Sequence, residues 1–116
     1  MVPSALLITL GSVTEDDRRL AELSDPDGRL VVLLEQIWAG KITRDHPELS
    51  HHLEDVLETV RTPDHAEPDP REDRRRYYRR RVGPSRWLLV VVSFEQQPGR
   101  IVTALATRRD PKRWKQ

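Results

Sequence analysis

Three stretches in the second half of the chain show the hydrophobic patterns of neighbouring strands. Residues 87 to 94, WLLVVVSF, are apolar on both faces, and RRRYYRRR at 74 to 81 and RIVTALAT at 100 to 107 flank them. The connections VGPS and EQQPG are short and rich in turn-forming residues, so consecutive strands run in opposite directions. The pattern predicts an antiparallel meander, with 87 to 94 as its central strand because that strand has no polar face.

A helical period of apolar positions begins near Asp45. Asp45 is suited to the N-cap position and Pro47 to the first turn, and the pattern predicts one helix from there to about Arg61. The predicted apolar face consists of Leu49, Leu53, Val56, Leu57 and Val60. On a helical wheel His46 lies about 40° from the centre of that face. His46 is therefore the one histidine of DHPELSHH that we expect to point inward.

The first part of the chain predicts short elements around a turn. Residues 13 to 23, with Thr14 and Asp17 at capping-box spacing, predict a short helix. SDPDGR at 24 to 29 predicts a tight turn, and LVVLL at 30 to 34 predicts a strand after it.

The remaining segments complete an α+β pattern. Residues 35 to 43 predict a short helix that ends at Gly40. The segment 62 to 73 is rich in proline and acidic residues, which predicts a loop, and a short edge strand is expected within it at 65 to 67. Strands and helices do not alternate regularly, so we expect N-terminal helices packed on one face of a C-terminal antiparallel sheet.

Length and composition indicate one domain, residues 1 to 116. The chain has no cysteine, which excludes disulfides and thiolate metal sites and fits a reducing compartment. An apolar run at 5 to 10 is too short to span a membrane and has no basic residue before it. We expect a soluble, cytoplasmic protein.

Charge divides the chain into two halves. Residues 1 to 70 carry fifteen acidic and six basic residues, a net charge of −9, whereas residues 71 to 116 carry four acidic and fourteen basic residues, a net charge of +10. Seventeen of the twenty basic residues are arginine, whose planar fork suits phosphate. The C-terminal half is expected to face a polyanion or the acidic half of its own fold. The basic tail, residues 108 to 116, is expected to fray.

His46 is the first candidate for chemistry. A helix N-terminus attracts anions and lowers the pKa of a nearby imidazole, and a neutral histidine serves as general acid or base. The alternative is a packed histidine that bonds to a carbonyl.

The run RRRYYRRR is the second candidate. In a strand, one face carries Arg74, Arg76, Tyr78 and Arg80, and the other carries Arg75, Tyr77, Arg79 and Arg81. Arginine interleaved with aromatic rings offers phosphate contacts and stacking for single-stranded nucleic acid. The alternative is an edge strand protected by its charges.

Thr103 is the third candidate, because it places a hydroxyl on a largely apolar strand face beside Ile101, Leu105 and Thr107. A threonine in such a position is more often a β-forming residue whose hydroxyl is satisfied by a neighbour. The four histidines lack the spacing of a metal site. No glycine-rich phosphate loop or thiol nucleophile is present, so we expect no cofactor and no metal.

An ordered set of short motifs resembles a known group of ribonucleases. The motifs are DGR at 27 to 29, LLEQIWAGKI at 33 to 42, DHPEL at 45 to 49, TVRTPDH at 59 to 65, YYR at 77 to 79 and IVTALAT at 101 to 107. In this order and spacing they resemble phage and bacterial domains of the barnase, EndoU, colicin and RelE-like (BECR) group. The similar core spans about residues 25 to 107.

The resemblance implies a helical layer on a curved antiparallel sheet and a metal-free ribonuclease that activates the ribose 2′-hydroxyl. By position, His46 would transfer protons, and Tyr78, Arg79 and Thr103 would line the cleft. Lys41 stands where such domains often have a second histidine, and it is then a candidate partner of His46.

Charge alone makes Arg76 or Arg80 a candidate for offsetting charge on the phosphorane. The leading hypothesis is a toxin-like, metal-independent endoribonuclease with His46 as acid or base. The alternatives are a module that binds RNA without cleaving it, and an interaction domain for an acidic antitoxin or immunity protein.

Overall fold

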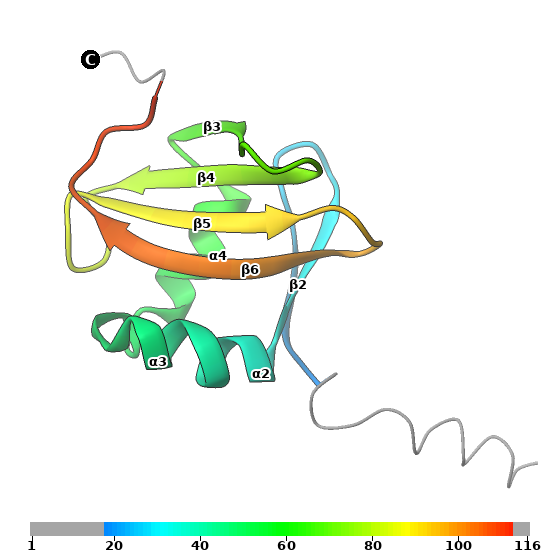
Figure 1. Cartoon of the computed structure of the whole chain (residues 1–116), viewed down its shortest axis with the longest axis horizontal. Coiled ribbons are helices and arrows are strands. Elements are labelled where there is room, and N and C mark those ends of the chain that lie inside the picture. The colour runs from blue at the N-terminus through cyan, green and yellow to red at the C-terminus, as the bar shows by residue number, and fades with distance from the viewer. Residues whose placement is uncertain (1–17, 113–116) are drawn as a thin grey trace, which may run out of the picture.

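The computed structural model of the protein describes residues 18–112, which form an α+β fold around one mixed, six-stranded sheet (Figure 1). The strand order is β1-β2-β6-β5-β4-β3. The strands are β1 (Arg19–Ser24), β2 (Leu30–Leu34), β3 (His65–Pro68), β4 (Arg74–Arg80), β5 (Trp87–Ser93) and β6 (Gly99–Thr107). All neighbours are antiparallel except β2 and β6, which run parallel. Within residues 18–112, every helix is too short or too polar to cross a bilayer.

The meander predicted from the second half of the chain is confirmed. β5 lies between β4 and β6 and pairs with both in antiparallel register. The predicted edge strand at 65 to 67 is β3, which pairs with β4 at the outer edge of the sheet. The sheet is larger than predicted, because the N-terminal hairpin β1–β2 joins it through two residue pairs between β2 and β6.

The predicted helix at 13 to 23 is wrong where the structure describes it: residues 19 to 23 belong to β1, and residues 13 to 17 lie outside the described part. The turn between β1 and β2 explains why residues 19 to 23 form a strand instead of a helix. The buried Asp25 carboxylate accepts hydrogen bonds from the backbone N–H groups of Asp27 and Arg29, at 3.0 and 2.8 Å. This closed turn directs β1 back along β2, and strand pairing outweighs the weak helical pattern.

The helical segment after β2 is longer than predicted and does not end at Gly40. It continues through α2 (Glu35–Ile37), the π-helical turn η2 (Trp38–Ile42) and α3 (Thr43–Asp45). The Thr43 hydroxyl donates to the Trp38 carbonyl oxygen at 3.0 Å, five residues earlier, which fits the wide turn. Gly40 does not adopt the left-handed conformation of a helix cap.

The predicted single helix from Asp45 to Arg61 is broken into two parts. Asp45 ends α3 instead of capping a new helix, and Pro47–Leu49 form the 3-10 turn η3. The proline ring disfavours helical dihedrals in the residue before it, and His46 has φ −132° and ψ 70°. The regular helix, α4, begins only at Leu53 and ends at Arg61.

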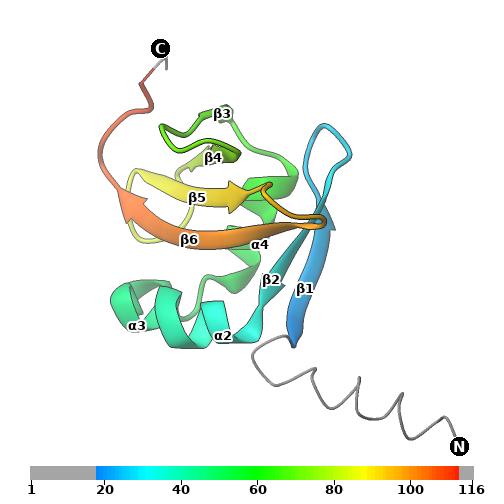
Figure 2. The same cartoon turned by 45° about the vertical axis from the view of Figure 1, so that its right-hand side comes forward.

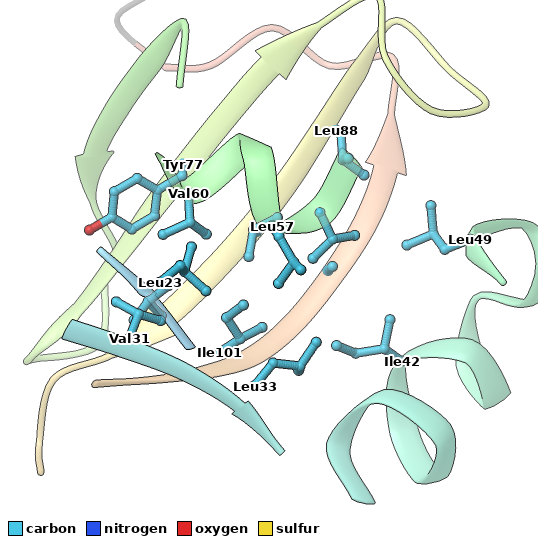
Figure 3. Packing of buried hydrophobic residues seen from close by; sticks show 14 residues of the cluster. Leu23, Val31, Leu33, Ile42, Leu49, Leu57, Val60, Tyr77, Leu88 and Ile101 are labelled. Carbon is cyan, nitrogen blue, oxygen red and sulfur yellow. The ribbon is translucent and has the colours of Figure 1, made fainter. Parts of the chain in front are cut away.

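The predicted apolar face of that region is nevertheless buried. Val56, Leu57 and Val60 of α4 share one core cluster with Tyr77 of β4 and Leu88 of β5 (Figure 3). Because side chains alternate along a strand, Tyr78 and the neighbours paired with it point to the opposite face of the sheet. Figures 1 and 2 show α4 on one side of β4, β5 and β6, and among residues 18–112 no helix covers the other side.

Replacement of Gly40 by alanine is expected to stabilise the protein by about 0.5–1 kcal/mol, because glycine loses more backbone freedom inside a helix. A Cβ at Gly40 would meet only Gln36 Cγ, at 3.9 Å. Urea unfolding measures the change. Gly28→Ala is the control, since Gly28 has φ +82° in open space and its replacement is expected to destabilise. A less stable Gly40→Ala variant would contradict the helical role.

Candidate functional site

A hollow of about 750 Å³ opens on the face of the sheet that the helices leave uncovered. Its volume lies in the usual range for ligand sites, about 300–1,000 Å³. The floor and walls come from β3, β4, β5, β6, the loop after β3 and the segment after β6. The lining residues are Glu67, Pro68, Asp69, Pro70, Arg76, Tyr78, Leu89, Leu105, Thr107, Arg109, Asp110 and Lys112.

A buried carboxylate, Glu67, lies at one end of the hollow and is 6% exposed. Its Oε1 lies 3.0 Å from His65 Nε2, and its Oε2 accepts a hydrogen bond from the Tyr78 hydroxyl at 3.2 Å. Arg76 Nη1 is 3.9 Å from the same Oε2. These four side chains meet because β3 and β4 place His65 opposite Tyr78 and Glu67 opposite Arg76 on one face.

Arg76 is held in the hollow by a second carboxylate. Its Nε donates to Asp69 Oδ2 at 2.8 Å, and this hydrogen bond raises the pKa of Arg76 above its ordinary value. Burial alone would raise the pKa of Asp69, but hydrogen bonds from the Arg71 backbone and from Arg76 outweigh burial and hold that pKa below its ordinary value. Arg76 is thus a fixed cation, with its Nη1 near Glu67.

Tyr78 supplies a neutral donor beside the carboxylate. Burial raises the pKa of its hydroxyl above the ordinary value, so the group keeps its proton at neutral pH. Its ring lies 5.8 Å from the His65 ring and 5.9 Å from the Trp87 ring, between centroids. These contacts pack the Tyr78 ring between the two neighbouring rings.

The structure brings several of the predicted site residues to the same face. Arg76 and Tyr78 line the hollow. The Arg80 guanidinium lies over the Trp87 ring, with Cζ 5.4 Å from its centroid. Thr103 is on this face too, because it pairs with Val91, but it does not line the hollow.

A bulge in β6 changes one detail of the predicted strand faces. Val92 pairs with Ile101 and Val91 with Thr103, so Val102 is an extra residue. Ile101 therefore points into the core and does not share a face with Thr103, contrary to the prediction from strict alternation.

The other predicted residues lie elsewhere. Arg79 Nη1 donates to the Thr62 carbonyl oxygen at 3.0 Å and to the Thr62 hydroxyl, at the end of α4. Lys41 Nζ donates to the carbonyl oxygen of the bulge residue Val102 at 2.9 Å. His46 Nδ1 is 3.6 Å from Glu48 Oε2, and His46 does not line the hollow. His46 and the Arg76–Tyr78 cluster are therefore not neighbours in one pocket.

Four residues near the hollow were not predicted from the sequence. Glu67, Arg109 and Lys112 line the hollow, and His65 contacts Glu67. A usable signal existed, because HAE in an edge strand places His65 and Glu67 on one face. The expected fraying of the basic tail is wrong for residues 108 to 112, since Pro111 is buried and Asp110 accepts a hydrogen bond from Trp87 Nε1 at 3.0 Å; residues 113 to 116 lie outside the described part.

Within residues 18–112, no group of three or more His, Asp or Glu side chains is placed to hold a metal ion. Comparisons with protein-family models, with curated proteins and with solved structures gave no match. A functional assignment must therefore come from the side chains that meet in the hollow.

Proposed function

We propose that the hollow is the active site of a metal-independent, toxin-like endoribonuclease. The observation that carries this proposal is the buried Glu67 carboxylate, which lines the hollow 3.9 Å from the fixed cation Arg76. A carboxylate that takes a proton beside a cation that stabilises negative charge is the pair of groups that cleavage of a phosphodiester by an internal nucleophile requires.

In the proposed reaction, Glu67 takes the proton of a ribose 2′-hydroxyl. The 2′-oxygen then attacks the adjacent phosphorus, the bond from phosphorus to the 5′-oxygen breaks, and that oxygen takes a proton from water. The protonated Glu67 gives its proton to the resulting hydroxide, which restores the carboxylate and the water. The products are a 2′,3′-cyclic phosphate and a free 5′-hydroxyl. Arg76 donates to the phosphate oxygens, where charge accumulates in the transition state, while the Tyr78 hydroxyl keeps its hydrogen bond to Glu67 Oε2 and holds the carboxylate in place.

His65 acts in this proposal as a positioning residue. Its Nε2 lies 3.0 Å from Glu67 Oε1, and it does not line the hollow. It orients the carboxylate and leaves Oε2, the oxygen nearer Arg76 and Tyr78, toward the substrate. Thr103 lies on the same open face as this cluster and remains a proposed contact for a longer substrate.

The experiment uses the full chain, a single-stranded oligoribonucleotide and excess EDTA. We expect cleavage to continue with the chelator, and the product to carry a 2′,3′-cyclic phosphate detectable by mass spectrometry. The matched substrate has one 2′-deoxyribose at the cleaved position and is expected to stay intact there. Cleavage at the deoxy position, or activity only with added divalent metal, would refute the proposed reaction.

One observation favours a second candidate, an RNA-binding protein without catalysis. Arg76 already donates to Asp69 at 2.8 Å, and one arginine nitrogen is therefore occupied before any phosphate binds. This candidate predicts salt-sensitive binding of RNA and no cleavage products after prolonged incubation.

A further inference from the structure

The segment after β6 forms a wall of the hollow. Figures 1 and 2 show it leaving the end of β6 and passing the ends of β5 and β4. The backbone N–H of Arg109 donates to the Thr107 hydroxyl at 3.0 Å, and Asp110 accepts from Trp87 Nε1 at 3.0 Å. Arg86 Nη2 lies 3.6 Å from Asp110 Oδ1, and Pro111 is buried. These contacts fix the segment from both sides of Asp110.

The carboxylates of the hollow lie beside basic side chains, but two of its basic side chains have no carboxylate of the described residues beside them. Asp69 pairs with Arg76, Asp110 pairs with Arg86, and Glu67 contacts His65. In the part of the chain that the structure describes, neither Arg109 nor Lys112 forms an ion pair with a carboxylate, although both line the hollow. The wall therefore carries two cations whose charge is available to an anion that enters.

The floor of the hollow is apolar. Leu89 of β5, the strand next to β4, and Leu105 of β6, the strand beyond it, contribute to the floor beside Tyr78. An unstacked nucleobase can lie on such a surface, whereas the bases of a duplex remain stacked and paired. The hollow thus combines a reactive end, an apolar floor and a cationic wall.

From this arrangement we infer that Arg109 and Lys112 form a second phosphate subsite, which binds a phosphate of single-stranded RNA next to the one that reacts at Arg76. This inference rests on the proposed function and deepens it. Asp110 is a positioning residue for the subsite, because it anchors the segment to Trp87. The occupant is a strand with at least two phosphates.

The test measures equilibrium binding of the full chain to 2′-O-methyl RNA, which lacks the hydroxyl needed for cleavage. Arg109→Ala/Lys112→Ala is expected to weaken binding of a hexanucleotide by at least about tenfold and to reduce its salt slope by about 0.7, the value for one single-strand phosphate contact. Binding of a dinucleotide, which has one phosphate, is expected to change less than about twofold, since one phosphate binds at Arg76.

The matched control is Arg100→Ala/Arg108→Ala, which removes two exposed cations that do not line the hollow. It is expected to change hexanucleotide binding by less than about threefold. Asp110→Ala should weaken hexanucleotide binding, and Asp110→Asn, which keeps an acceptor for Trp87 Nε1, should restore most of it. Equal losses in the two double variants, or no loss in Arg109→Ala/Lys112→Ala, would overturn the inference.

The design separates the two proposals. If the hexanucleotide binds as expected but unmodified RNA is not cleaved, the subsite stands and the proposed catalysis fails. If RNA is cleaved but the double variant binds and cleaves it like the parent, the catalysis stands and the subsite is wrong.

Discussion

Glu67→Gln is expected to lower kcat for RNA cleavage by about 10²- to 10⁴-fold, the usual contribution of a general base. Glutamine has nearly the same shape and still offers an oxygen to the Tyr78 hydroxyl, but it cannot take the 2′-hydroxyl proton. KM should therefore change little. Initial rates at several concentrations of an oligoribonucleotide measure both constants, and thermal unfolding checks that the variant is folded.

Two control variants change residues outside the hollow. Glu48→Gln removes the carboxylate beside His46, and His46→Ala removes the histidine that sequence analysis favoured. Both lie outside the hollow, and we expect both variants to cleave RNA within about twofold of the parent rate. Loss of activity in His46→Ala with full activity in Glu67→Gln would return the catalytic role to His46.

Asp25→Ala is expected to destabilise the protein by about 2–4 kcal/mol. The Asp25 side chain is fully buried, and its carboxylate accepts hydrogen bonds from the Tyr77 hydroxyl at 2.8 Å and from Arg29 Nε at 3.0 Å. Burial raises the pKa of Tyr77 above its ordinary value, so its hydroxyl is a permanent donor that would be left buried without this acceptor. Urea unfolding at neutral pH measures the loss.

Asp27→Ala is the matched control, because Asp27 is 71% exposed and lies 3.6 Å from the same Arg29; we expect a change within about 0.5 kcal/mol.

The contribution of Asp25 to the free energy of unfolding should also depend on pH. Burial would raise the pKa of Asp25, but the hydrogen bonds from Arg29 and Tyr77 outweigh it and lower the pKa. Its contribution is present above its unfolded pKa, about 3.9, and is lost as the pH falls through the folded value. Unfolding energies of parent and Asp25→Ala should therefore converge toward low pH, and a constant difference would argue against this account.

The strands of the meander and the apolar face of α4 were predictable because burial imposes regular periods on the sequence. The strand at residues 19 to 23 was not predictable, because it depends on the Asp25 turn and on pairing with β2, and the local sequence pattern contains neither. Likewise, the break after Asp45 follows from Pro47, whose effect on His46 competes with the helical pattern and exceeds it.

The candidate site was predictable only in part. Arg76 and Tyr78 share a face by simple alternation, and the structure brings both to the hollow. Glu67 was missed because its environment comes from the pairing of β3 with β4, in which it lies opposite Arg76. Arg109 and Lys112 were missed because their segment is held by a long-range contact between Asp110 and Trp87, which composition alone does not reveal.

The parallel pairing of β2 with β6 limits when the sheet can form during synthesis of the chain. β2 is made early, but its partner residues Gly99 and Arg100 emerge some seventy residues later. Contacts so distant in sequence form slowly, and the N-terminal hairpin cannot join the sheet until almost all of the described chain has been synthesised. The segment containing Arg109 and Lys112 follows β6 in the sequence, so the hollow can be complete only after β2 and β6 are both available to pair.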